Sequence, residues 1–260
     1  MKNTRWPILM AVLALGLSVL PVRAAERAVV TIHLAGDSTM AEKLPEKRPE
    51  TGWGEFLAAQ FQLGTVAVDN RARNGRSTRT FIEEGRWQAL LEATQPGDVV
   101  LIQFGHNDQS VEKRDRYTPP ADYARNLERF VSDVRGKQAT PVLLTPVARR
   151  RFDDAGRLLD SHGEYPDLVR DLAAREHVAL VDMQRRSEGL FQEAGVEASK
   201  SLFLWVAPGH ANYPNGVEDN THFSPKGAAC IASEFAMALR NSGLPLARRL
   251  KKDAGDVVCR

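Results

Sequence analysis

The chain has 260 residues, of which 43% are hydrophobic, and this is enough for one sizeable core. Its formal charge of +2 is close to neutral and gives no reason to expect nucleic acid or an anionic membrane surface as a partner. Two basic clusters, at residues 149–151 and 248–252, are therefore expected to be a solvated loop and a solvated tail.

Residues 1–24 have the pattern of a secretory signal peptide. Lys2 and Arg5 precede an apolar segment from Ile8 to Leu20, and Val22-Arg23-Ala24 has small residues at the spacing of a cleavage site, with cleavage expected after Ala24 or Ala25. The apolar segment is short for a membrane span, although an uncleaved anchor is the alternative. We expect residues 25–260 to form a single exported domain, located in the periplasm or outside the cell.

From Ala28 onward, strand-like runs alternate with helix-like patterns. Strands are expected at residues 29–34, 65–68, 99–104, 140–145 and 178–181, and helices at residues 55–61, 81–91, 120–135, 166–176, 183–194 and 225–240. Ser224 and Pro225 have the residue types of an N-cap and a first helical position. This alternation predicts a parallel sheet covered by helices on both faces, which is a three-layer α/β/α domain.

Unusual polar residues follow several of the predicted strands. They are Ser38 after the first strand, Asn74 and Gly75 after the second, Asn107 after the third, and Asp219 and His222 on a loop before the last helix. Because parallel strands end at the same edge of a sheet, these groups should gather there. A hydroxyl, an imidazole, a carboxylate and N–H donors are the groups that acyl transfer needs.

Four short motifs carry a family resemblance. They are Gly36-Asp37-Ser38, the later Gly75, Gly-His-Asn-Asp at residues 105–108, and Asp219-x-x-His222. In this order they resemble the SGNH, or GDSL-type, hydrolases, and most closely the rhamnogalacturonan acetylesterase branch, from about Ile32 to Gly227. The resemblance implies a flavodoxin-like sheet of five parallel strands in the order 2-1-3-4-5.

The resemblance also implies a role for each motif residue. Ser38 is expected to be the nucleophile and His222 the general base. The spacing of Asp219 suits a carboxylate that holds the ring Nδ1–H, so that Nε2 faces Ser38. The implied oxyanion hole consists of the Ser38 and Gly75 backbone N–H groups and the Asn107 side-chain amide. Asp37, which is expected to cap the turn, and His106 are supporting residues. No cofactor is implied, and no metal-ligand spacing is present.

These expectations define a secreted serine esterase that removes O-acetyl groups from plant cell-wall polysaccharide, either rhamnogalacturonan (pectin) or xylan, through an acyl-enzyme. The protein is expected to be a monomer. Trp205, His210 and Tyr213 are candidates for a sugar cleft, although core packing of Trp205 fits equally well. Two alternatives are a lipase or thioesterase that acts on longer acyl esters, and a carbohydrate-binding protein without turnover.

Other residues support less specific expectations. Cys230 and Cys259 are either joined in a disulfide bond or both free, since export permits a disulfide. Asp108 is expected to bond the backbone locally. The histidines without a motif are expected at the surface or in loops; they are His33, His162, His177 and His210. Ser110-x-x-Lys113 is interpreted as a chance match to a motif of other serine enzymes.

Overall fold

The computed structural model describes residues 1, 28–257 and 259. The predicted signal peptide falls almost entirely on residues 2–27 and so lies outside the described residues, and the domain boundary at residue 25 stays a prediction. Within the described ranges, no helix is both long enough and apolar enough to cross a membrane.

A five-stranded parallel sheet forms the centre of the fold. Its strands are β1 (Val30–Gly36), β2 (Val66–Asn70), β3 (Val99–Gln103), β4 (Thr140–Leu144) and β5 (Ala179–Val181), in the order β2-β1-β3-β4-β5. Both the predicted α/β class and the predicted strand order are confirmed. The order changes direction between β1 and β3, and in open α/β sheets ligands bind beyond the carboxyl ends of the strands at such a point.

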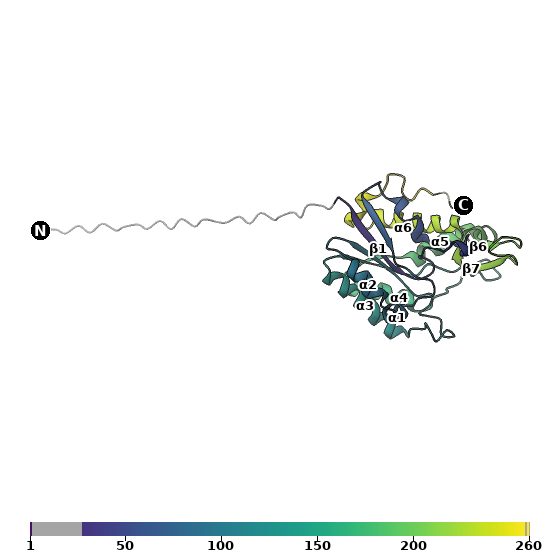
Figure 1. The fold of residues 1–260 in the computed structure, drawn as a ribbon, viewed down its shortest axis with the longest axis horizontal. Coiled ribbons are helices and arrows are strands. Elements are labelled where there is room, and N and C mark those ends of the chain that lie inside the picture. Colours follow the sequence, from purple (N-terminus) through teal and green to yellow (C-terminus); the bar gives the residue numbers. More distant parts are fainter. Residues whose placement is uncertain (2–27, 258, 260) are drawn as a thin grey trace.

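Helices cover both faces of the sheet (Figure 1). They are α1 (Thr78–Glu83), α2 (Arg86–Ala93), α3 (Pro120–Gly136), α4 (Tyr165–Arg175), α5 (Met183–Ala198) and α6 (Pro225–Arg240). In Figure 1, α5 and α6 lie on one side of β1, and α1 to α4 lie on the other. Ser224 caps α6 as predicted, because its hydroxyl accepts the backbone N–H of Gly227 at 3.1 Å.

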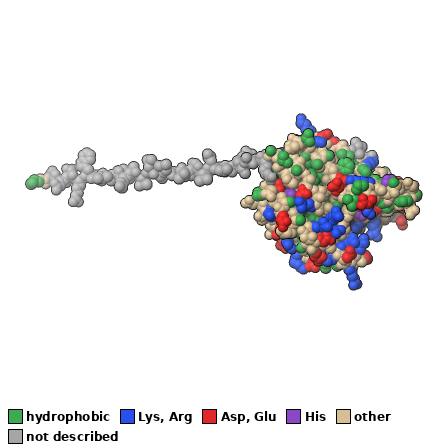
Figure 2. All heavy atoms as spheres, viewed as in Figure 1, with side chains coloured by type: hydrophobic (Ala, Val, Ile, Leu, Met, Phe, Trp, Pro, Cys, Tyr) green, Lys and Arg blue, Asp and Glu red, His purple; other side chains and the backbone are tan. Residues whose placement is uncertain are grey.

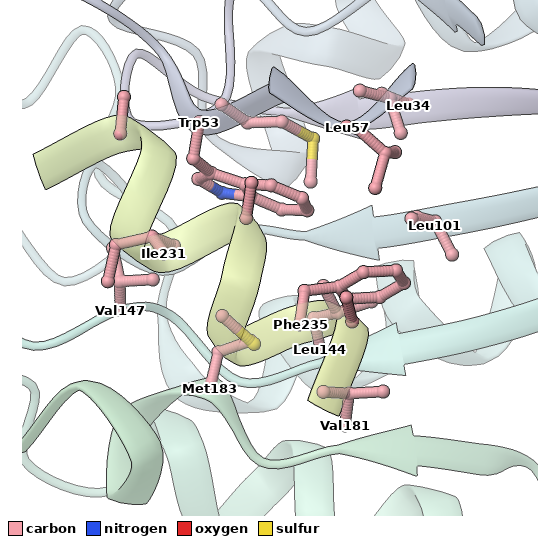
Figure 3. Close-up of a cluster of buried hydrophobic side chains, with 14 of the residues drawn as sticks. Leu34, Trp53, Leu57, Leu101, Leu144, Val147, Val181, Met183, Ile231 and Phe235 are labelled. Atoms are coloured by element: carbon pink, nitrogen blue, oxygen red, sulfur yellow. The ribbon is translucent and has the colours of Figure 1, made fainter. Parts of the chain in front are cut away.

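The core is divided by the sheet into two clusters, since successive strand side chains point to opposite faces. Along β3, Leu101 belongs to the cluster under α6, whereas Val100 and Ile102 belong to the other. In the first cluster Trp53 stacks on Phe235 of α6 with ring centroids 5.6 Å apart (Figure 3). The helix α6 is therefore fixed against the sheet beside the turn that follows β1.

Three elements differ from the expected pattern. The predicted helix at residues 81–91 is two helices, because Gly85 adopts φ 71°, a left-handed conformation that ends α1 and begins α2. The predicted helix at residues 55–61 is two short 3₁₀ helices, η2 (Trp53–Phe56) and η3 (Ala58–Gln60). An antiparallel pair of strands, β6 (Phe203–Val206) and β7 (Val217–Phe223), was not predicted.

The carboxyl-terminal segment packs against the domain. Cys230 of α6 and Cys259 are joined by a disulfide bond, which decides between the two alternatives left by the sequence. Leu246 of η5 (Pro245–Arg249) and Leu250 are buried, and the Lys251 N–H donates to the Gln60 carbonyl at 3.0 Å. The tail is thus partly docked rather than fully solvated. On the face in Figure 2, basic and acidic side chains are interspersed over the surface.

Candidate active site

The turn that carries Ser38 is fixed by a chain of buried hydrogen bonds. The Asp37 carboxylate accepts the Thr39 backbone N–H at 2.9 Å and the Thr39 hydroxyl at 2.8 Å, so Asp37 caps the turn as expected. Gln103, at the end of β3, donates its amide to the Thr39 hydroxyl oxygen at 2.9 Å and accepts the Trp53 indole N–H at 3.0 Å. This chain holds the turn after β1 against both β3 and the core.

Ser38, His222 and Asp219 lie in hydrogen-bond contact. The His222 Nε2 lies 2.9 Å from the Ser38 Oγ, and its Nδ1 lies 2.7 Å from the Asp219 Oδ2. An ionised carboxylate only accepts, so Nδ1 carries the ring proton and Nε2 is left to accept from the Ser38 hydroxyl. Burial alone would raise the pKa of Asp219, but the hydrogen bond and charge of His222 outweigh it and lower that pKa below its usual range.

Asp219 and His222 lie on strand β7 and not on the predicted loop. The Asp219 Oδ1 accepts the backbone N–H groups of Thr221 at 2.6 Å and His222 at 2.9 Å, which produces a tight local turn within an irregular strand. A loop prediction was reasonable because this turn interrupts regular pairing with β6. The same carboxylate therefore fixes both the backbone and the ring of His222.

Ser38, Gly75 and Asn107, whose N–H groups are the predicted oxyanion hole, line the same cavity. Within the described part of the chain, neither the Ser38 N–H nor the Gly75 N–H donates to an acceptor. Gly75 has φ 76°, a left-handed conformation that glycine adopts easily, and the Arg116 guanidinium lies only 3.1 Å from where a Cβ would stand. The Asn107 Nδ2 donates to the Arg76 carbonyl at 2.9 Å, which ties the turn after β3 to the turn after β2.

These groups line a cavity of about 740 Å³. Every side chain in its wall is polar or charged; the lining residues are Ser38, Lys47, Glu50, Asn74, Gly75, Arg76, Thr80, Glu84, His106, Asn107, Ser110, Lys113, Asp115, Arg116, Arg149, Thr221 and His222. Among the described residues there is no group of three or more His, Cys, Asp or Glu side chains that could hold a metal ion. The cavity therefore suits a polar ligand.

Comparison with known proteins agrees with these motifs. Residues 34–230 match the GDSL-like Lipase/Acylhydrolase family. The chain belongs to this family. The chain is 43% identical over 228 residues to rhamnogalacturonan acetylesterase RhgT of Bacillus subtilis, and this match covers 87% of the chain and 96% of the relative. A probable rhamnogalacturonan acetylesterase of the same organism, YesY, is 37% identical and covers 85% of the chain and 98% of the relative. The family resemblance and the enzyme class expected from it, carboxylic ester hydrolase, are confirmed.

Two solved structures share the fold. YxiM of Bacillus subtilis has a TM-score of 0.71 at 26% identity; the match covers 83% of this chain and 57% of that chain. A catalytic mutant of Axe2, an acetylxylan esterase from Geobacillus stearothermophilus, has a TM-score of 0.58 at 18% identity and covers 80% of this chain and 93% of that one. At the latter identity the likeness concerns the fold alone.

One histidine of this GDSL-like protein contradicts the expectation of a surface or loop position, and a second lies in a loop as expected but is buried there. His33 of β1 is buried between two carboxylates, with its ring nitrogens 2.9 Å from an oxygen of Asp69 and 3.3 Å from one of Asp98. His162 is buried against His106, with His162 Nε2 at 3.2 Å from His106 Nδ1. Burial lowers the pKa of both His106 and His162, that of His162 to about 3, so both rings are neutral.

The basic cluster at residues 149–151 is also not a simple solvated loop. Arg150 is buried and donates to Ser199 Oγ at 3.0 Å and to Asn220 Oδ1 at 2.9 Å, which ties β7 to the segment after α5. Arg149 is half-buried and donates to the carbonyls of His106 and Ser161 at 3.2 and 3.0 Å. Both arginines hold segments that border the cavity, and only Arg151 is exposed.

The turn after β3 is locked by Asp108 in a way that the sequence did not predict. Its carboxylate bonds a distant residue, accepting the Thr78 N–H at 2.9 Å and the Thr78 hydroxyl at 2.6 Å at the start of α1. The expected local backbone bond is therefore wrong. Burial raises the pKa of Asp108 from 3.8 to about 7.

The aromatic residues proposed for a sugar cleft do not line the cavity. Trp205 packs partly against the core and lies between Arg150 and Lys200, whose charged groups are 5.1 and 4.7 Å from its ring. The Tyr213 hydroxyl donates to the Lys47 carbonyl at 2.8 Å. The loop that carries His210 and Tyr213 instead supports the segment beside Lys47, which does line the cavity.

Proposed function

We propose that this GDSL-type protein is an exported carbohydrate O-acetylesterase. The observation that supports it most directly is the polar wall of the cavity beside the Ser38 hydroxyl. A long acyl chain would bury apolar surface against such a wall without gain, whereas a sugar could hydrogen-bond to it. The polar wall thus favours an acetyl ester over the longer acyl esters of a lipase or thioesterase.

In the proposed reaction Ser38 Oγ attacks the acetyl carbonyl while His222 Nε2 takes the hydroxyl proton. The carbonyl oxygen becomes an oxyanion, which the N–H groups of Ser38 and Gly75 and the Asn107 amide would stabilise. The tetrahedral intermediate collapses to an acetyl-enzyme, and His222 returns the proton to the sugar oxygen that leaves. Water, deprotonated by His222, then releases acetate and restores the Ser38 hydroxyl.

Rhamnogalacturonan is the substrate that we favour. The relatives RhgT and YesY are named for rhamnogalacturonan acetylesterase activity, and each match covers nearly the whole length of the relative. The charge of the cavity wall also favours this acidic polysaccharide. Two arginines in the wall, Arg76 and Arg116, pair with acidic side chains, and the wall has three further basic residues: Lys47, Lys113 and Arg149. The galacturonate units of rhamnogalacturonan carry carboxylates that such a wall would attract.

The test compares acetate release by the mature protein and its Ser38→Ala variant. Acetylated rhamnogalacturonan, acetylated xylan and a long-chain p-nitrophenyl ester are supplied separately. We expect acetate from rhamnogalacturonan with the wild type and a loss of at least about 10⁴-fold in the variant. Ser242→Ala, which changes an exposed serine beyond α6, is the control and should keep wild-type turnover.

Two outcomes would contradict the proposal. Hydrolysis of only the long-chain ester would identify a lipase-like enzyme. A wild type that releases no acetate and whose Ser38 does not react with a fluorophosphonate would instead favour a carbohydrate-binding protein on the same fold. The proposed export is tested separately, by determining the amino-terminal residue of the protein recovered outside the cytoplasm.

A further inference from the structure

Lys43 is buried directly behind the candidate nucleophile. Its side chain is 0% exposed, and its Nζ contacts the Ser38 carbonyl oxygen, the Asn74 Oδ1 at 2.8 Å and the Glu50 Oε1 at 2.9 Å. An ammonium group has three N–H donors, so each of them has an acceptor here. Burial lowers the pKa of Lys43, and the Glu50 carboxylate opposes that effect. The burial of Lys43 and Glu50 was not predicted, because both residues lie in a stretch that has the composition of a solvated loop.

The contacts of Lys43 join two parts of the site that are separate in the sequence. The Ser38 turn follows β1, and the turn of Asn74 and Gly75 follows β2. Ser38 and Gly75 both line the cavity, and among the described residues neither backbone N–H donates to an acceptor. A single buried side chain therefore fixes the distance between the two backbone donors of the proposed oxyanion hole, and its positive charge lies beside the peptide group of the nucleophile.

Glu50 connects this ammonium group to the candidate base. The same Glu50 Oε1 that accepts from Lys43 lies 4.0 Å from the His222 Nε2. The Glu50 side chain is 10% exposed, so water screens this interaction only in part. During acyl transfer His222 becomes an imidazolium, and a carboxylate at this distance stabilises that charge.

We propose that Lys43 and Glu50 are positioning residues of the esterase reaction: Lys43 holds the Ser38 turn against the Asn74–Gly75 turn, and Glu50 holds Lys43 and stabilises protonated His222. This inference rests on the proposed function of the same site. The competing interpretation is a buried ion pair that only stabilises the fold. The two interpretations differ in what they predict for the protonation of His222.

Several charged or titratable groups surround His222 besides this pair. They are Asp219 on its own strand, Asp37 below the Ser38 turn, and His106 and Arg149 in the cavity wall. All four are unchanged when Glu50 or Lys43 is replaced. A shift in the pH dependence of activity in such a variant is therefore assigned to the charge that was removed.

The deciding experiment is the pH dependence of kcat/KM for acetyl ester hydrolysis in Glu50→Gln and Lys43→Met. Glu50→Gln removes a negative charge near His222 and leaves Lys43 uncompensated, so the acid limb of the profile should move to lower pH by about half a unit or more. Lys43→Met leaves the Glu50 charge uncompensated, so the limb should move to higher pH. Opposite shifts would not result from a general loosening of the site.

Two controls lie outside the site. Glu55→Gln removes a carboxylate from the same segment that pairs instead with Arg48 and should leave the acid limb in place. Arg170→Met breaks the partly buried pair of Arg170 with Asp182 and should change stability alone.

Lys43→Met should also change the kinetics at a fixed pH. It should lower kcat about tenfold or more with KM nearly unchanged, and should slow the labelling of Ser38 by a fluorophosphonate in parallel.

The outcomes separate this inference from the proposed function. If the wild type hydrolyses the acetyl ester but the acid limb is the same in Glu50→Gln as in the wild type, the positioning role of the pair is wrong and the esterase stands. If Lys43→Met does not fold, Glu50→Gln and the double variant Lys43→Met/Glu50→Gln still carry the test, and the double variant should show a smaller pH shift than either single change. A wild type without esterase activity or phosphonate labelling overturns both proposals.

Discussion

The Ser38 Oγ and the His222 Nε2 lie 2.9 Å apart although 184 residues separate them in the sequence. The turn that carries Ser38 is held by hydrogen bonds that link Asp37, Thr39 and Gln103. His222 is held by both carboxylate oxygens of Asp219. The contact therefore depends on two independently supported segments that meet at the carboxyl edge of the sheet. In the proposed mechanism, a change in either support should therefore lower turnover even when both Ser38 and His222 are present.

Asp219→Asn should lower kcat by about 10²–10⁴-fold. The asparagine oxygen can still accept the backbone N–H groups of Thr221 and His222, so the local turn should persist. The side-chain NH₂ of the asparagine, however, would donate to the ring Nδ1, so the ring proton would move to Nε2, which could then no longer accept from Ser38. The variant would also lack the negative charge that stabilises the imidazolium. The measurement is kcat for an acetyl ester above neutral pH.

Asp153→Asn is the matched control for this change. The Asp153 carboxylate also accepts two backbone N–H groups, those of Ala155 and Arg157 at 3.0 and 2.8 Å, but it lies outside the cavity wall. It should retain wild-type kcat. Turnover of Asp219→Asn within a few-fold of the wild type would show that the carboxylate does not assist His222.

Asn107→Ala should lower kcat by about 10²–10³-fold with a small effect on KM, because an oxyanion donor acts mainly in the transition state. One N–H of the Asn107 amide is already used on the Arg76 carbonyl, which orients the group. Asn241→Ala at the end of α6 removes an exposed asparagine and should be silent. An Asn107→Ala enzyme with nearly full kcat would remove this amide from the proposed oxyanion hole.

Asp108 makes the stability of the fold depend on pH. Because burial raises its pKa from 3.8 to about 7, the folded state binds the proton more tightly than the unfolded state between these values. The free energy of unfolding should therefore fall as the pH rises from about 4 to 7, by up to about 4 kcal/mol from this group. Asp37, whose pKa burial also raises, acts in the same direction.

The contribution of Asp108 is isolated by comparing Asp108→Asn with the wild type. An asparagine oxygen can accept both groups of Thr78 without a titratable charge, so the stability of the variant should fall less over this pH range. Urea unfolding at pH 4.5, 6 and 7.5 measures the difference. Parallel curves for the two proteins would mean that Asp108 is ionised throughout and that its environment is less apolar than the structure indicates.

The sequence predicted the sheet because buried parallel strands form continuous apolar runs that stand out from their surroundings. It also predicted that Ser38, Gly75, Asn107 and His222 gather at one edge of the sheet, where they line one cavity, since short motifs at strand ends need little knowledge of distant contacts. The strands β6 and β7 were missed because the polar residues of β7 hide the alternation that identifies a strand. Periodicity cannot reveal a strand whose side chains serve a site.

The sequence predicted the burial of charged and polar side chains less well than it predicted the strands. Lys43, Glu50 and Arg150 belong to polar stretches, yet each is buried. Lys43 and Glu50 pair with each other, and Lys43 and Arg150 also bond to residues far away in the chain, Asn74 and Asn220. His33 is similar, since it pairs with Asp69 and Asp98 on neighbouring elements. Residue type alone favours exposure for such groups, and only the three-dimensional arrangement supplies the partners that make burial acceptable.

Loss of the bond between Cys230 and Cys259 should lower the free energy of unfolding by roughly 3–4 kcal/mol, because the disulfide closes a loop of 29 residues in the unfolded chain. Cys259→Ser tests this by urea unfolding. Turnover should be unchanged under native conditions, since the bond lies away from the cavity wall and the tail is also held by Leu246 and Leu250. A reducing agent should lower the free energy of unfolding of the wild type to that of the variant, and should leave that of the variant unchanged. If the wild type is equally stable with and without the reducing agent, the two sulfurs are not joined in the protein in solution.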